Sequence, residues 1–169
     1  MTNTAAQKQN SHKICEIVLN EDNITQISPE ATYERKAATN DLLAENSFLP
    51  LRTIDNVEAI GPFKLVLDIK RGKLIFDIRN QDDAPIMLHI LSLSPFRLIM
   101  KDYFLICERH HEAVKSANPQ QIEAIDMGRR GLHNEGSELL SDRLKGKIKV
   151  DFETARRLYT LICALHWKG

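Results

Sequence analysis

The sequence lacks net charge, and it lacks any long apolar run. Its 23 Lys and Arg residues balance 23 Asp and Glu residues, so the overall charge does not favour nonspecific nucleic-acid binding, which needs clustered cations to neutralise several phosphates. No stretch approaches the roughly 18 apolar residues of a membrane span. Residues 1–12 are polar and contain no apolar core of a signal peptide. We therefore expect a cytoplasmic protein with no membrane partner.

Cysteine is scarce, and its distribution argues against disulfides. The three residues Cys15, Cys107 and Cys163 are odd in number, far apart and each surrounded by apolar neighbours. This pattern is typical of reduced, buried thiols in a reducing compartment. A nucleophilic cysteine would need a base or a helix N-terminus nearby to lower its pKa, and the sequence spacing provides neither.

Several familiar catalytic and cofactor motifs are also absent. The chain has no Walker loop, no dinucleotide fingerprint, no Gly-x-Ser-x-Gly and no paired Cys-x-x-Cys. Glu108 and His111 have the Glu-x-x-His spacing of carboxylate-bridged metal sites, but such sites need a second copy on a facing helix. The chain contains no second copy. We therefore expect neither a metal nor a cofactor.

The composition is that of an ordinary globular protein. The 169 residues are 43% hydrophobic and 27% charged, which is enough to bury one core without disulfides or metal. We expect residues 1–12 to form a disordered tail and residues 13–169 to form a single globular α+β domain.

The clearest local signal is a β-hairpin at residues 63–80. Apolar and polar side chains alternate along residues 63–70 and again along residues 73–80, with Arg71-Gly72 between them. A two-residue turn there pairs apolar residues with one another, so the turn and the alternation independently predict one register. The predicted pairs are Ile69 with Leu74, Leu67 with Phe76, and Leu65 with Ile78.

Other strands are expected on both sides of this hairpin. Residues 14–19 read as a strand with Cys15 facing the core, and residues 85–93 as a strand buried on both faces because the run is almost continuously apolar. Residues 145–150 are expected to contain a short edge strand, and residues 46–60 a connection.

Four helices are expected, each opened by a capping residue. Ser28, Ser94 and Asn118 each precede a proline, and Asp151 precedes residues 152–167. The second helix is apolar nearly all round and is predicted to be the central core helix. The order β-α-β-β-β followed by helices predicts a small, mainly antiparallel sheet covered by a C-terminal group of about three helices.

The segment with the most unusual composition is residues 126–137, within the third helix. Gly128, Gly131 and Gly136 together disfavour a helix by about 3 kcal/mol. Either another backbone or a ligand approaches closely there, or the helix breaks and the segment is a loop.

In a continuous helix, Arg129 would fall within the apolar stripe, one turn before His133. One interpretation is an anion site in which His133 is the candidate catalytic acid or base. The candidate ligand-binding residues of that site are Arg129, Arg130, Asn134 and Ser137. The other interpretation is structural: Arg129 pairs with a carboxylate from elsewhere, and the glycines admit a neighbouring strand.

The leading interpretation is a non-enzymatic interaction or regulatory protein, because the sequence assembles no complete catalytic constellation. Its partner would be another protein or a second copy of the chain. The alternative is an enzyme or binding protein for a phosphate-bearing or nucleotide-like ligand held by the Arg/His cluster. The first predicts an exposed apolar patch, and the second a concave pocket into which the two arginines and His133 converge.

Five segments of the chain resemble an uncharacterised bacterial protein family, the UPF0262 group. They are residues 45–48, 76–79, 101–108, 122–140 and 151–157. The resemblance covers nearly the whole chain beyond the tail, and it implies no activity, substrate, cofactor or partner. The histidines of residues 108–112 are not part of the family's motif, which further weakens the metal interpretation.

Overall fold

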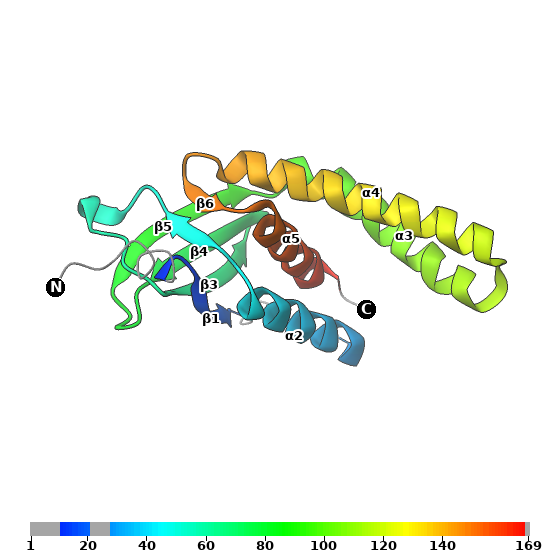
Figure 1. Cartoon of the computed structure of the whole chain (residues 1–169), viewed down its shortest axis with the longest axis horizontal. Coiled ribbons are helices and arrows are strands. Elements are labelled where there is room, and N and C mark those ends of the chain that lie inside the picture. Colours follow the sequence, from blue (N-terminus) through cyan, green and yellow to red (C-terminus); the bar gives the residue numbers. More distant parts are fainter. Residues whose placement is uncertain (1–10, 21–27, 168–169) are drawn as a thin grey trace.

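The main sheet has four strands in the order β1-β3-β4-β5 (Figure 1). The computed structural model describes residues 11–20 and 28–167, so only Ser11 and His12 of the predicted tail fall within it. Strand β1 (Ile14–Leu19) runs parallel to β3 (Phe63–Lys70), whereas β3, β4 (Lys73–Arg79) and β5 (Pro85–Ser92) are antiparallel. The prediction of a mainly antiparallel sheet in an α+β fold is confirmed.

The β3–β4 hairpin has the predicted register. Ile69 lies opposite Leu74, and the other two predicted pairs are also formed. Arg71 and Gly72 both have positive φ, at 53° and 73°, as a two-residue turn of type I′ requires. The turn and the hydrophobic pattern therefore fix the same alignment.

Four α-helices complete the fold. They are α2 (Pro29–Ala44), α3 (Arg97–Ser116), α4 (Pro119–Leu144) and α5 (Phe152–His166). Three of the predicted caps are confirmed: Ser28, Asn118 and Asp151 each accept a hydrogen bond from the backbone amide three residues on, over 2.8–3.1 Å. Ser94 does not cap α3. Instead, Ser94–Phe96 form one 3₁₀ turn, η2, directly before it.

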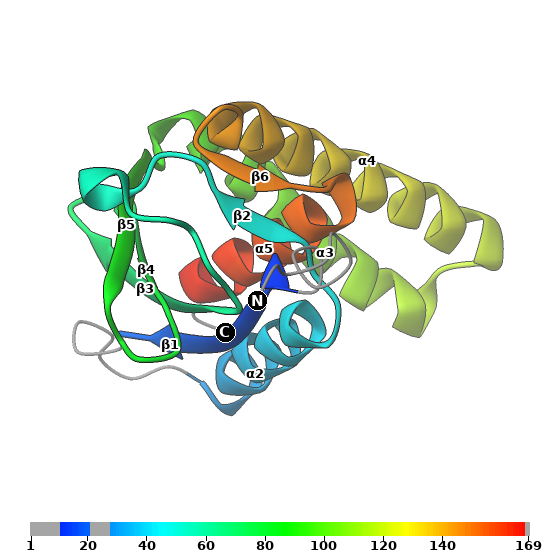
Figure 2. The same cartoon turned by 60° about the vertical axis from the view of Figure 1, so that its left-hand side comes forward.

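The central core helix is α5, so the assignment of that role to the second predicted helix was wrong. Nine residues of α5 are buried, whereas α3 buries only Met100 and Ala113. Helix α5 packs against both α2 and α4 and lies between them, while α3 and α4 form a long hairpin that extends beyond it (Figures 1 and 2). Helix α3 is amphipathic, and its apolar side chains Leu98 and Leu105 are 68% and 50% exposed.

Strand β5 is buried on one face only, which corrects the prediction of a strand buried on both. Met87, His89 and Leu91 face the core, but Leu88 and Ile90 are 57% and 53% exposed. A continuously apolar run does not reveal which of its alternate residues is covered. None of the helices in the described part of the chain covers Leu88 and Ile90 on the second face.

A second sheet of two strands joins distant parts of the chain. Strand β2 (Phe48–Pro50) pairs antiparallel with β6 (Ile148–Val150). The edge strand predicted within residues 145–150 is confirmed as β6, whereas its partner lies in the segment expected to be a simple connection. The 3₁₀ turn η1 (Ile54–Asn56) follows β2.

The cysteines are unpaired, but not all are buried as predicted. Cys163 is buried, Cys107 is half-buried and Cys15 is exposed. The register between β1 and β3 shifts between Ile14 and Glu16. An irregularity of this kind changes the alternation of side chains along a strand, so Cys15 points away from the core.

Candidate functional site

Helix α4 is continuous through residues 126–137, so the loop alternative was wrong. A Cβ at Gly136 would overlap the phenol ring of Tyr159, and one at Gly128 would lie 2.7 Å from Ile106 Cδ1. Nothing lies within 4 Å of a Cβ at Gly131. Two of the three glycines therefore admit side chains from α5 and α3, rather than a neighbouring strand or a ligand.

The two arginines share one carboxylate on their own helix. Asp126 Oδ1 accepts from Arg129 Nε at 3.1 Å and Nη2 at 2.7 Å, and Asp126 Oδ2 lies 2.9 Å from Arg130 Nη2. The hydrogen bonds from Arg129 are the largest cause of the lowered pKa of Asp126. The structural interpretation expected a carboxylate from elsewhere in the chain, and the partner is instead one turn away.

His133 faces α5 rather than the arginines. Its Nε2 lies 2.7 Å from Thr160 Oγ1. Because the Thr160 hydroxyl donates to the Arg156 carbonyl oxygen at 3.0 Å, it accepts from His133 Nε2–H, which places a proton on Nε2. Burial, followed by the nearby charges of Arg156 and Arg129, lowers the pKa of His133 to about 4.

The remaining predicted residues do not complete an anion site. The Ser137 side chain is buried and donates to the His133 carbonyl oxygen at 2.8 Å, while its Oγ lies 3.5 Å from His133 Nδ1. Asn134 is half-buried, and its Oδ1 has no hydrogen-bond partner in the described part of the chain. The five candidates therefore separate: Arg129 and Arg130 share Asp126, His133 lies beside Ser137, and Asn134 Oδ1 has no partner among the described residues.

Two tyrosines from other helices enclose His133. The ring centroids of Tyr103 on α3 and Tyr159 on α5 lie 5.6 Å and 5.3 Å from that of His133. Burial raises the pKa of both tyrosines, and it raises the pKa of Cys163 to about 12. Sequence spacing does not connect these residues with His133, because three separate helices bring them together.

This arrangement joins the helices and is poorly suited to acid–base chemistry. A histidine with a pKa near 4 is neutral at neutral pH and a weak base there, whereas an efficient catalyst has a pKa near the working pH. The arginines are occupied by Asp126, and the thiol of Cys163 is protonated. We therefore describe Tyr103, His133, Tyr159 and Thr160 as the three-helix junction.

Metal ligation has no support from the described residues. Among residues 11–20 and 28–167, no group of three or more His, Cys, Asp or Glu side chains is placed to hold an ion. His110 Nε2 instead lies 3.8 Å from Asp126 Oδ1.

The exposed apolar surface lies on the side of the main sheet away from α5. Adjacent strands place Val18 beside Val66, and Ile75 beside Ile90. The strands alternate, so these residues share a face opposite the buried side chains of β3, β4 and β5. We call this surface the outer sheet face. Its residues are Val18, Lys64, Val66, Asp68, Lys73, Ile75, Asp77, Arg79, Leu88 and Ile90.

Comparison with known proteins identifies the family. The model of the Uncharacterised protein family (UPF0262) matches residues 11–168. The chain belongs to this family. A UPF0262 protein of Bradyrhizobium diazoefficiens is 48% identical over 169 residues, and one of Nitrobacter hamburgensis is 49% identical over 169 residues, with all of each chain covered. One of Rhizobium leguminosarum is 52% identical over 157 residues, which are 93% of this chain and 96% of the relative.

No solved structure matches the chain significantly. Within the described residues, no helix combines the length and the apolar character needed to cross a bilayer. The UPF0262 relatives carry no activity in their names, so the function must be argued from the surfaces described above.

Proposed function

We propose that this UPF0262 protein is a non-enzymatic cytoplasmic interaction protein, and that the outer sheet face is its docking surface for a second copy of the chain. The proposal treats residues 13–169 as one folded unit. The observation that carries it is the exposure of Leu88 and Ile90, at 57% and 53%, in the middle of a regular strand.

The apolar side chains on the outer sheet face form neighbouring pairs rather than scattered single residues. The half-buried Ile75 lies directly across from the exposed Ile90, and the half-buried Val66 directly across from Val18, which is 37% exposed. Single exposed apolar residues need no explanation, but contiguous ones mark interaction sites. Burying Leu88 and Ile90 would remove large aliphatic groups from water, at about 25 cal/mol per Å² of apolar area.

The charges on the same face suit a second copy. Arg79 Nη2 lies 3.0 Å from Asp77 Oδ2, and Lys70 Nζ lies 3.3 Å from Asp68 Oδ2. Both signs are therefore interspersed on the face, and its carboxylates Asp68 and Asp77 are already paired, so two copies can meet without large fields of like charge. The chain as a whole has no net charge to keep copies apart.

The alternative of a phosphate-binding enzyme at the Arg/His cluster has weaker support. Arg130 is 69% exposed at its side chain and shares Asp126 with Arg129, and His133 points to Thr160 instead of toward them. The predicted convergence of Arg129, Arg130 and His133 is thus missing.

The unpaired cysteines are in keeping with a reducing, cytoplasmic location.

Sedimentation velocity over a range of protein concentrations tests the proposal. We expect the wild-type chain to shift from monomer to dimer as its concentration rises, and Ile90→Lys to remain monomeric. Because Ile90 is half exposed and lysine can extend into solvent, the substitution should leave the fold intact, which circular dichroism would verify.

Leu98→Lys is the matched control. Leu98 is 68% exposed on α3, away from the outer sheet face, so this variant should associate as the wild type does. A monomeric wild type at all concentrations, or equal dimerisation of both variants, would exclude self-association through the outer sheet face.

A further inference from the structure

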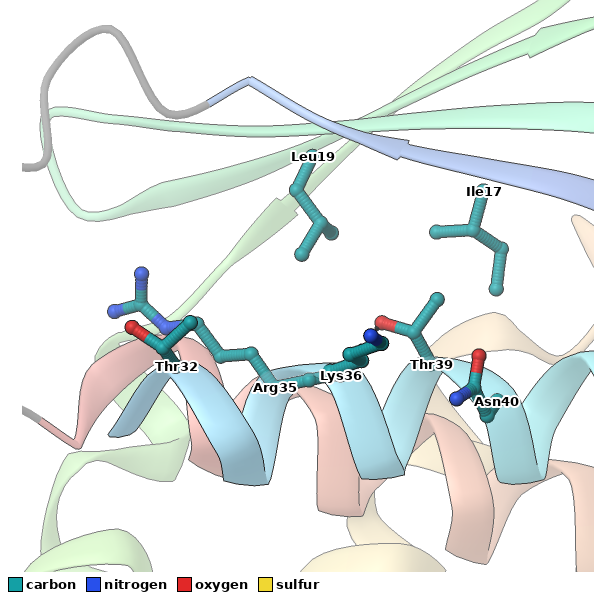
Figure 3. A pocket seen from close by; sticks show the side chains of 7 residues that line it. All are labelled: Ile17, Leu19, Thr32, Arg35, Lys36, Thr39 and Asn40. Carbon is teal, nitrogen blue, oxygen red and sulfur yellow. Dashed lines mark hydrogen bonds between the residues drawn. The ribbon is translucent and has the colours of Figure 1, made fainter. Parts of the chain in front are cut away.

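A pocket of about 400 Å³ lies between β1 and α2 (Figure 3). Ile17 and Leu19 extend from β1 toward α2 and form its apolar side. Helix α2 supplies the rest of the lining, which consists of Thr32, Arg35, Lys36, Thr39 and Asn40. Among the described residues, this lining contains two cations and no carboxylate.

Arg35 is the unusual member of this lining, because it is 97% buried and has no acidic partner among the described residues. Its Nε donates to the Ala164 carbonyl oxygen at 3.1 Å, and its Nη2 to the Leu165 carbonyl oxygen at 3.0 Å. These carbonyls belong to the C-terminal end of α5, whose partial negative charge stabilises a cation. These two carbonyl oxygens accept only some of the five N–H groups of the guanidinium, and they do not neutralise its charge.

The third nitrogen of Arg35, Nη1, is buried and has no hydrogen-bond partner in the part of the chain that the structure describes. A buried donor without an acceptor typically costs about 1–3 kcal/mol, and a buried cation is normally paired with an anion. Arg35 runs along the α2 side of the pocket toward the end that holds Thr32 (Figure 3). Arg35 lines the pocket, so its guanidinium, which lacks an acceptor and a negative partner, lies beside the space that a ligand would occupy.

The other polar groups of the pocket indicate the ligand's chemistry. Thr32 and Thr39 use their hydroxyl protons on the backbone carbonyls of Ser28 and Arg35, so they do not donate to a ligand. The ammonium group of Lys36 and the amide of Asn40 have no partner within residues 11–20 and 28–167, and both are donors. Donors and positive charge gather on the α2 side, opposite two aliphatic side chains.

We propose that this pocket binds a small organic anion, a carboxylate with a short aliphatic chain. The carboxylate would pair with Arg35 and Lys36, and the chain would lie against Ile17 and Leu19. The volume falls within the range usual for small-molecule sites, which combine apolar walls with a few placed polar groups. This site is separate from the outer sheet face and does not depend on self-association.

Octanoate is a suitable probe, with octanol, octylammonium and inorganic phosphate as comparisons. We expect octanoate to raise the melting temperature in proportion to the logarithm of its concentration. We also expect it to shift the backbone amide NMR signals of β1 and α2. Octanol and octylammonium should bind more weakly because they lack the negative charge, and phosphate because it lacks the chain. Equal binding of octanol and octanoate would overturn the proposal, as would binding of phosphate alone.

Lys36→Gln separates ligand binding from fold stability, because Lys36 is exposed on α2 and its removal should not unfold the chain. We expect this variant to weaken octanoate binding about fivefold, the change that corresponds to one screened ion pair. Lys115→Gln on α3, also exposed, is the matched control and should bind as the wild type does. Equal affinities for the two variants, or octanoate shifts that map to β5 instead of α2, would contradict the assignment.

Discussion

Individual residues of α4 show why its unusual composition is compatible with a helix. Gly136 sits against the fully buried ring of Tyr159, whereas Gly131 faces open space. The two positions are in the same helix but have different reasons for lacking a side chain. Of these two glycines, only Gly136 is needed for packing.

This difference predicts opposite effects of the same substitution. Gly136→Ala should destabilise the fold by about 1–3 kcal/mol or more, because the new methyl group displaces Tyr159 in a packed core. Gly131→Ala should stabilise it by about 0.5–1 kcal/mol, because alanine is the better helix former. Urea unfolding of both variants measures the two values, and destabilisation by Gly131→Ala comparable with that by Gly136→Ala would show that the packing is misassigned.

Arg129 is a second residue whose environment changes an expectation. Its partner Asp126 lies on the same helix, is partly exposed and keeps Arg130 when Arg129 is removed. Arg129→Ala should therefore cost about 1 kcal/mol or less in free energy of unfolding, with no dependence on added phosphate. A loss of about 3–5 kcal/mol would instead indicate a charge left buried without a partner.

His133 makes the free energy of unfolding depend on pH. Its pKa is lowered from 6.5 to about 4, so between these values the unfolded chain binds a proton at this position that the folded chain does not. The free energy of unfolding should fall as pH falls through that window. Burial also lowers the pKa of His89 and His166, so they act in the same direction.

We predict that His133→Gln reduces this pH dependence. The slope of unfolding free energy against pH should decrease by about one proton near pH 5, relative to the wild type. Urea titrations at several pH values provide the measurement, and His12→Gln serves as a control with the same chemical change. An unchanged slope would mean that His133 titrates normally in the folded protein.

At the scale of elements, the sequence predicts best where two local signals agree. The β3–β4 register follows from both the Arg71-Gly72 turn and the alternation, and three helices begin where a cap precedes residues that favour a helix. Phe76 faces the core with no exposure. Phe76→Ala should therefore cost about 3–5 kcal/mol, measured by denaturant unfolding, and a cost under about 1 kcal/mol would place Phe76 outside the packed core.

Elements were misassigned where tertiary packing decides between equivalent patterns. Helices α3 and α5 are both rich in apolar residues, and only the arrangement of the sheet and α2 determines that α5 becomes the buried one. Strand β5 offers two apolar faces, of which the core covers one. The pairing of β2 with β6 joins segments about a hundred residues apart, and local sequence carries no signal of it.

The candidate site shows the same limit. Asp126 lies one helical turn before the two arginines and pairs with both, although the structural interpretation expected Arg129 to pair with a carboxylate from elsewhere. Spacing could not show that His133 would form a hydrogen bond with Thr160, because that contact depends on how α5 crosses α4. Spacing also gave no indication of a role for Arg35, whose Nε donates to a carbonyl oxygen at the end of α5, 129 residues away in the sequence.

At the scale of the whole molecule, the described helices cover one face of the main sheet and leave the other open at Leu88 and Ile90. Helix α5 fills the inner side, and α2 and α4 pack on it (Figure 2). The open side combines apolar pairs with locally neutralised charges in a chain of zero net charge. A partner that presents the same mixture of apolar and paired charged side chains would bury the apolar residues without leaving charges unpaired. A second copy of the chain presents that mixture.

The most direct test of this account is an isotope-filtered NOE experiment on a mixture of methyl-labelled and unlabelled chains. We predict intermolecular contacts from the methyl groups of Leu88, Ile90 and Ile75, and none from Leu98 or Leu105 on α3. Intermolecular contacts confined to the α3 and α4 methyl groups, or none at concentrations approaching millimolar, would contradict the claim that the outer sheet face binds a second copy.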